Sequence, residues 1–136
     1  MKYLVLGTTG IAGHIISIYL CEQGHDVTTY SRTAFPYGSN RIGDITDPIF
    51  LQSLLLEDSY DAIVNCIGML NNACEVNQKD SIYINSYLPH AIVSLLENRQ
   101  TKLIHLSTDC VFSGKTSPYQ ENSLAMGKPF MIVRRH

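Results

Sequence analysis

Hydrophobic residues in this chain fall into short continuous runs separated by longer segments with helical spacing. The runs are rich in β-forming residues and predict four strands, at residues 2–6, 27–31, 61–67 and 102–107. Helical spacing predicts three helices, at residues 11–24, 48–56 and about 77–98. Asp47 is the expected N-cap of the second helix, and Pro89 is expected to bend the third. Residues 33–43 and 113–129, which contain glycines and prolines, are predicted as loops.

Strand and helix alternate three times before the fourth strand. This order predicts an α/β fold, a Rossmann-like parallel sheet with helices on both faces. The strands are almost wholly apolar, as expected where both faces of a sheet are buried. We therefore expect one domain, a Rossmann half over residues 1–112, followed by a loop and irregular tail over residues 113–136.

Composition narrows the classes of function. Ten Lys and Arg against twelve Asp and Glu give the 136 residues a net charge of −2, which disfavours binding to nucleic acid. No apolar stretch approaches the roughly 20 residues of a membrane span, and no secretory leader precedes the first strand, so we expect a cytoplasmic protein that binds no membrane. The cysteines form no Cys-x-x-Cys pair and the histidines show no ligand spacing, so reduced thiols and no metal site are expected at Cys21, Cys66, Cys74 and Cys110.

A glycine-rich turn joins the first strand to the first helix. Gly7, Gly10 and Gly13 would let the backbone approach a pyrophosphate, which the free N–H groups of the following helix attract. The alternative is a tight turn that binds no ligand. In the dinucleotide interpretation, the turn residues Thr9, Ile11 and Ala12 also contact the cofactor.

The end of the second strand bears on which dinucleotide is bound. NAD-specific sites usually place an acid there for the ribose 2′-hydroxyl, whereas an arginine suits a 2′-phosphate. Ser31 and Arg32 occupy this position without an acid, which favours NADP over NAD as cofactor and leaves NAD possible. An exposed arginine with no ligand is the alternative.

Several motifs resemble a known family. The spacing Gly-x-x-Gly-x-x-Gly resembles that of extended short-chain dehydrogenases/reductases, and the run from Ser107 to Gly114, Ser-Thr-Asp-Cys-Val-Phe-Ser-Gly, is similar to that of dTDP-4-dehydrorhamnose reductases and related sugar-nucleotide reductases. Pro118-Tyr119-Gln120-Glu121 also suits that branch. The resemblance implies further cofactor contacts, from Asp44 and Ile45 at adenine and, after the third strand, from Asn65, Cys66, Ile67 and Gly68.

The same resemblance assigns the substrate side. It implies that the catalytic residue Thr108 holds the carbonyl oxygen of the substrate; a strand-end threonine that only satisfies a turn is the alternative. It places five further residues near the sugar or nicotinamide, which could equally be loop packing: Met69, Leu70, Asn71, Asp109 and Val111.

The proton donor of this family is missing from the sequence. The reductases use a Tyr with a Lys four residues later, because an unperturbed phenol titrates near pH 10. None of the eight tyrosines has a lysine at that spacing, and residues 130–136 read Phe-Met-Ile-Val-Arg-Arg-His where the family continues with the dyad. A single-nucleotide frameshift is our hypothesis for this tail.

The resemblance implies NADPH-dependent reduction of a 4-keto deoxysugar nucleotide, in the synthesis of surface-polysaccharide sugars, with this chain inactive alone. The alternatives are a non-catalytic dinucleotide-binding or regulatory module and an epimerase or dehydratase of the same superfamily. Without the rest of the sheet, the fourth strand would be an unprotected edge, so we expect weak stability and self-association through that edge.

Overall fold

The computed structural model describes residues 1–70, 72–108, 112, 115, 118–120 and 122–123. It divides into two compact units, Met1–Leu106 and Ser107–His136. The helices and strands described below all belong to the first unit.

The first unit is built on a parallel sheet in the order β3-β2-β1-β4-β5. This order confirms the predicted α/β fold and is that of the first five strands of a doubly wound dinucleotide-binding sheet. The strands are β1 (Lys2–Leu6), β2 (Asp26–Ser31), β3 (Ser39–Ile42), β4 (Ala62–Asn65) and β5 (Lys102–His105).

The prediction of a loop over residues 33–43 is wrong in its last part, where β3 forms. Its sequence, Ser-Asn-Arg-Ile, has no apolar alternation, because β3 is an edge strand with largely exposed side chains. Asn40 stabilises the pairing with β2: its Nδ2 donates to Thr29 Oγ1 (3.2 Å) and to Ser31 Oγ (3.3 Å). A hydrogen-bonding pattern of this kind leaves no hydrophobic signal in the sequence.

The helices follow the prediction closely at the start of the chain and less closely later. α1 is Ile11–Glu22, and α2 is Pro48–Leu56 with Asp47 as its N-cap, whose carboxylate accepts the Ile49 N–H at 2.9 Å. The single helix predicted at about 77–98 is instead a series of short elements that begins earlier. It comprises α3 (Asn72–Val76), α4 (Gln78–Ile82), a π-helical turn (Tyr83–Tyr87) and α5 (Leu88–Leu95).

Pro89 stands in the first turn of α5, directly after the π-helical turn. Because proline has no N–H to donate to the preceding turn, a regular helix cannot continue through this position. The widened turn accommodates that lost hydrogen bond. The interruption therefore falls near the predicted bend.

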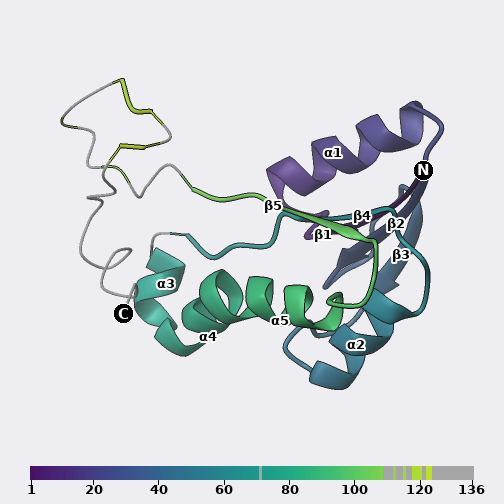
Figure 1. The fold of residues 1–136 in the computed structure, drawn as a ribbon. Coiled ribbons are helices and arrows are strands. Elements are labelled where there is room, and N and C mark those ends of the chain that lie inside the picture. Colours follow the sequence, from purple (N-terminus) through teal and green to yellow (C-terminus); the bar gives the residue numbers. More distant parts are fainter. Residues whose placement is uncertain (71, 109–111, 113–114, 116–117, 121, 124–136) are drawn as a thin grey trace. The chain divides into compact units, whose positions relative to one another are not determined.

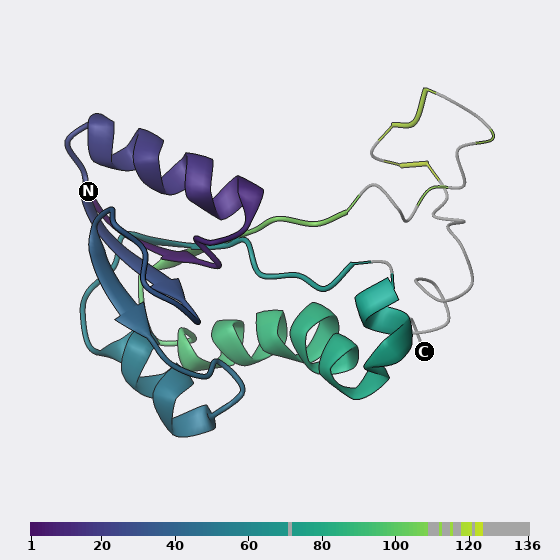
Figure 2. The ribbon, with the colours of Figure 1, turned by 180° about the vertical axis from the view of Figure 1, so that it is seen from behind.

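Two hydrophobic clusters hold the layers together. α1 covers one face of the sheet, while α2 and α5 cover the other (Figures 1 and 2). The larger cluster lies on the α2 and α5 face and includes Leu4, Leu6, Leu54, Ile63, Leu88 and Ile92. The smaller one lies beneath α1 and consists of Val5, Val27 and Val64, with Ile16 and Leu20 of the helix packed against it. Each fully buried aliphatic side chain contributes about 1.5–3 kcal/mol, so the larger cluster dominates the stability of this unit.

Candidate dinucleotide-binding site

The glycine-rich turn is fastened to the neighbouring strand by backbone hydrogen bonds. The N–H groups of Gly7 and Thr8 both donate to the carbonyl oxygen of Tyr30, at 2.9 and 3.1 Å. Gly7 has φ +86°, a conformation that side-chain-bearing residues rarely adopt, and a Cβ there would lie 3.0 Å from Ile67 Cγ1. The first glycine is thus required both by its backbone conformation and by the chain that follows β4.

Gly13 lets the first turn of α1 lie directly against this loop. A Cβ at Gly13 would sit 2.3 Å from the carbonyl oxygen of Gly7, a distance that no side chain tolerates. Gly10 is the N-cap of α1, and no side chain caps the helix there. The first N–H groups of a helix have no partner within the helix and carry its positive end. The glycine cradle, formed by Gly7, Gly10 and Gly13, therefore suits an anion. Thr9, Ile11 and Ala12, around the cap, are exposed.

The structure brings Arg32 and Asp44, two predicted cofactor residues, close together, although they lie twelve positions apart in the chain. Ser31 at the end of β2 is buried, and its hydroxyl donates to the Thr33 carbonyl oxygen at 2.6 Å. Hydrogen bonds from the hydroxyl and N–H of Thr46 lower the pKa of Asp44, and the nearby positive charge of Arg32 lowers it further. An acid therefore lies near Arg32, although the end of β2 itself provides none.

Tyr30 organises the segment that carries Asp44. Its hydroxyl donates to the Gly43 carbonyl oxygen and accepts the Ile45 N–H, both at 3.0 Å, while its ring packs in the larger cluster. Burial raises the pKa of Tyr30, so this phenol stays protonated. The Ile45 side chain is itself buried in that cluster, and its backbone carbonyl oxygen accepts from the Tyr83 hydroxyl at 3.5 Å.

The chain after β4 forms the other wall of the glycine turn. Asn65, fully buried at the end of β4, accepts the Ile67 N–H on its Oδ1 at 3.0 Å and lies 3.2 Å from His105 Nδ1 through its Nδ2. Since the amide nitrogen donates, His105 Nδ1 is the acceptor in this pair. Burial raises the pKa of the Cys66 thiol to about 11, so the thiol remains neutral.

Sequence reasoning missed the residue that holds this wall in place. Asn85, in the π-helical turn, clamps the backbone of Met69: its Oδ1 accepts the Met69 N–H and its Nδ2 donates to the Met69 carbonyl oxygen, both at 2.8 Å. The Cys74 thiol, nearly fully buried, also donates to that oxygen, at 3.0 Å. A lone asparagine among apolar helical residues was the available signal, but its partner is 16 positions away.

The predicted substrate residues are only partly described. Met69 is half-buried and Leu70 is 58% exposed, on the segment that Asn85 holds. Thr108 belongs to the second unit, in which it is half-buried. Asn71, Asp109, Cys110 and Val111 lie outside the described residues.

The described residues contain neither a helix suited to cross a membrane nor a cluster of metal ligands. None of their helices has the length and apolar character that crossing a membrane requires. Among the same residues, no three His, Cys, Asp or Glu side chains are grouped as a metal ion would need. Cys21, Cys66 and Cys74 are free thiols.

Comparison with known proteins identifies similar sugar-nucleotide reductases. The chain is 31% identical over 124 residues to a probable low-salt glycan biosynthesis reductase of Haloferax volcanii, covering 89% of this chain and 41% of that protein. It is 28% identical over 125 residues to a probable dTDP-4,6-dihydroxy-2-methyloxan-3-one 4-ketoreductase of Streptomyces antibioticus, covering 90% and 40% of the two chains. The chain thus spans about two fifths of the length of these relatives.

Solved structures agree with the fold. A hypothetical dTDP-4-dehydrorhamnose reductase from Sulfolobus tokodaii superposes with a TM-score of 0.82 at 26% identity, over 93% of this chain and 46% of that one. MoeE5, solved with UDP-glucose and NAD, shares the fold with a TM-score of 0.82 at 17% identity, over 98% of this chain and 45% of its own. The sequence pattern of the family described as RmlD substrate binding domain matches residues 1–128. The chain belongs to that family.

Proposed function

We propose that this chain supplies the dinucleotide-binding half of a reductase that uses NADPH to reduce a 4-keto deoxysugar nucleotide, in the synthesis of surface-polysaccharide sugars. The observation that carries the proposal is the close packing of Gly13 on Gly7, which sets the start of α1, uncapped by any side chain, against the glycine-rich turn, where its first N–H groups can bind an anion. The reductase names of the relatives support the reaction class. Because the chain spans only about two fifths of those relatives, the complete reaction would need further polypeptide.

In this proposal backbone groups and side chains together bind the cofactor. The first N–H groups of α1 bind the pyrophosphate, and Arg32 binds the ribose 2′-phosphate. Asp44 and Ile45 lie at adenine, while the segment from Asn65 to Gly68 lies beside the cofactor. The bound nicotinamide supplies the hydride.

On the substrate side, the Thr108 hydroxyl donates a hydrogen bond to the carbonyl oxygen and so polarises the carbonyl group. Five residues would line the sugar: Met69, Leu70, Asn71, Asp109 and Val111. The developing oxyanion needs a proton, and the sequence holds no Tyr-x-x-x-Lys pair to provide it. We therefore propose that the chain alone has no turnover. We also place it in the cytoplasm, where its cysteines would stay reduced.

Calorimetric titration with NADPH and NADH tests the cofactor assignment. NADPH should bind more tightly, and Arg32→Ser should weaken NADPH binding about tenfold while leaving NADH binding unchanged, because only NADPH carries the 2′-phosphate. Arg41→Ser is the matched control, since it removes an equal charge from an exposed arginine that pairs with Glu57. Equal losses for both cofactors, or equal effects of the two substitutions, would contradict the role of Arg32.

A second candidate function is a non-catalytic dinucleotide-binding or regulatory module, which the missing Tyr-x-x-x-Lys pair favours. Adding the C-terminal remainder of a relative as a separate chain distinguishes the two functions. Restored NADPH oxidation with a dTDP-4-keto-6-deoxysugar supports the reductase, whereas NADPH binding without any restored turnover supports the module. NADPH oxidation by the 136-residue chain alone would refute its proposed inactivity.

A further inference from the structure

The loop between β2 and β3 carries Arg32 and folds back against β2. Residues 32–34 are exposed, whereas Phe35 is only 7% exposed. Gly38, with φ +68°, allows this close return, because a Cβ there would lie 2.4 Å from the carbonyl oxygen of Val27. The exposed arginine therefore belongs to a loop whose second half is packed against the strand before it.

Two hydroxyl groups of β2 hold the two ends of this loop. Thr29 and Ser31 are almost completely buried, on the same face of β2 as Val27, which belongs to the cluster beneath α1. The Thr29 hydroxyl donates to the Tyr37 carbonyl oxygen at 3.2 Å. The Ser31 hydroxyl donates to the Thr33 carbonyl oxygen at 2.6 Å. Since a hydroxyl group has one hydrogen, each of the two oxygens can only accept from a third group.

Asn40 of β3 is that third group. Its Nδ2 donates to Thr29 Oγ1 at 3.2 Å and to Ser31 Oγ at 3.3 Å. Its Oδ1 accepts the Phe35 N–H at 3.1 Å, in the middle of the loop. Burial of polar groups costs free energy unless they are paired, and the described residues contain no buried side-chain nitrogen or oxygen without a partner. One amide therefore connects β2, β3 and the loop that carries Arg32.

The ring of Phe35 holds the other side of the loop against α1. It lies edge-on to the His14 imidazole, with ring centroids 5.3 Å apart, and packs beside Tyr37 at 5.6 Å. His14 follows Gly13 in α1, and its N–H donates to the Gly10 carbonyl oxygen at 2.9 Å. The loop is thus in contact with the start of α1, where the proposed function places the pyrophosphate.

We propose that Asn40 is a positioning residue that gives this site its preference for NADPH, because it fixes the Arg32 loop relative to the start of α1. NADPH presents a pyrophosphate and a 2′-phosphate on either side of one ribose. A loop that is already fixed can bind both groups with a smaller loss of conformational entropy. NADH has no 2′-phosphate and gains nothing from the position of Arg32. This inference rests on the proposed contact between Arg32 and the 2′-phosphate.

Limited proteolysis tests the anchoring without any cofactor. Asn40→Ala removes the acceptor of the Phe35 N–H and the donor to both hydroxyl groups, so the loop should open more often. Trypsin should then cleave after Arg32 about fivefold faster than in the parent chain, as measured by mass spectrometry. Thr101→Ala is the matched control, because it removes one part-buried hydrogen bond, to the Tyr60 carbonyl oxygen, at the amino ends of the strands. Cleavage after Arg32 at the parent rate, or equally fast in both variants, would overturn the proposal.

A double-substitution cycle tests the effect on specificity. By calorimetry, Asn40→Ala should weaken NADPH binding about fivefold and leave NADH binding unchanged. In a chain that already carries Arg32→Ser, Asn40→Ala should cause no further loss of NADPH binding, because the group that it positions is gone. A full further loss in that chain would show that Asn40 acts independently of Arg32 and would refute the positioning role.

The two cofactors separate this inference from the assignment on which it rests. Equal losses of NADPH and NADH binding in Asn40→Ala, beside a selective loss in Arg32→Ser, would refute the role of Asn40 alone. Arg32→Ser without selectivity would refute the cofactor assignment itself.

Thr29→Val is a second variant, which decides the question if circular dichroism shows that Asn40→Ala does not fold. Valine has a similar size and favours strands, so the substitution removes the Thr29 hydroxyl with little other change. It should weaken NADPH binding by about two- to threefold, since only part of the network is lost, and leave NADH binding unchanged. Unchanged NADPH binding, or an equal loss for the two cofactors, would refute the proposal.

Discussion

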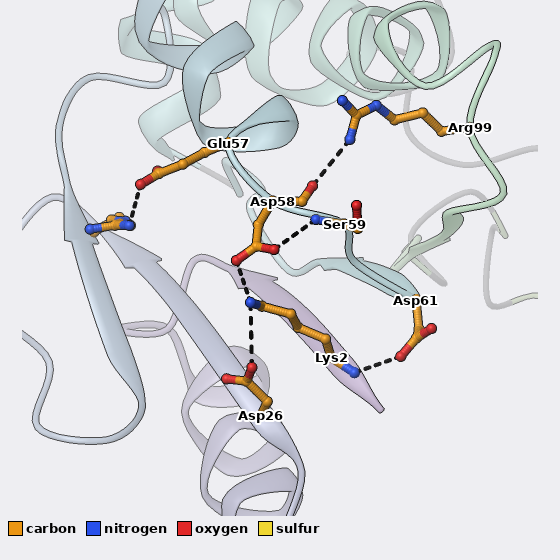
Figure 3. Close-up of polar contacts among 8 residues, drawn as sticks. Lys2, Asp26, Glu57, Asp58, Ser59, Asp61 and Arg99 are labelled. Atoms are coloured by element: carbon orange, nitrogen blue, oxygen red, sulfur yellow. Dashed lines mark hydrogen bonds and ion pairs between the residues drawn. The ribbon is translucent and has the colours of Figure 1, made fainter.

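The two ends of the central sheet are held together by different chemistry. At the carboxyl ends of the strands, glycine backbone groups and neutral side chains such as Tyr30 and Asn85 make the hydrogen bonds. At the amino ends, charged side chains take part in the contacts (Figure 3). Lys2 pairs with Asp26 at 3.4 Å and with Asp58, and its backbone N–H donates to Asp61 Oδ2 at 2.6 Å. The carboxyl end therefore leaves helix N–H groups available to a ligand, while the amino end uses its charges within the chain.

Arg99 is an example of a charged group at the amino ends of the strands that is hydrogen-bonded within the chain. Its guanidinium donates to the carbonyl oxygens of Asp58, at 3.1 Å, and Leu56, at 3.5 Å, close to the end of α2. A cation at a helix C-terminus satisfies carbonyl groups that have no partner in the helix. The guanidinium that caps α2 is thereby engaged by the chain itself, in contrast to the uncapped start of α1.

Blocking the glycine cradle, at the carboxyl ends of the strands, should have the largest effect, a loss of dinucleotide binding. Gly13→Val places a branched side chain where even a Cβ would lie 2.3 Å from Gly7 O, so the turn and α1 must separate. We expect dinucleotide binding to weaken at least about a hundredfold, or roughly 2.8 kcal/mol. Calorimetry with NADPH measures this loss.

Gly24→Ala separates that effect from general destabilisation. Gly24 has φ +74°, so alanine is strained there, but nothing lies within 4 Å of its Cβ, and the residue stands at the other end of α1. This variant should lose some stability and retain NADPH binding. Undiminished binding by Gly13→Val would show that the glycine cradle is not the dinucleotide site.

Replacing Asn85, which holds the Met69 backbone, should have an intermediate effect, a loss of stability. Asn85→Leu keeps the size of the side chain but leaves the Met69 N–H without its amide partner and takes one donor from the Met69 carbonyl oxygen. Leaving a part-buried N–H without a partner costs about 1–3 kcal/mol, and the Met69 carbonyl oxygen keeps the Cys74 donor, so we expect the free energy of unfolding to fall by about 1–3 kcal/mol. Urea denaturation measures it, with Asn98→Leu, at an exposed position, as control. Equal losses for both variants would contradict the clamp.

Sequence patterns predicted the parts of this molecule that depend on neighbouring residues in the chain. The glycine turn and the bounds of α2 were found because a strand, a turn and a helix, or Asp47 followed by Pro48, are contiguous signals. β3 was missed because it pairs through polar groups, and Asn85 because its partner, Met69, lies 16 positions away in the segment after β4. The proximity of Arg32 and Asp44 likewise arises only when β3 places the second beside the first.

Weakening the ion pairs at the amino ends of the strands should have the smallest effect on stability. This effect should depend on pH. The hydrogen bond from Lys2 lowers the pKa of Asp58, and the Ser59 N–H lowers it further. A lowered folded-state pKa means that the ionised carboxylate stabilises the fold above its unfolded pKa, near 3.9, and that this contribution is lost as pH falls through the folded-state value. Asp58→Asn should therefore lower the denaturation midpoint slightly at pH 7, and the difference from the parent chain should vanish in acid. The difference should also shrink in 1 M salt, because these side chains are partly exposed.

Glu97→Gln, at another exposed acid, is the control for Asp58→Asn. A loss of stability in Asp58→Asn that stays constant from pH 7 to pH 2 would contradict the ion pair.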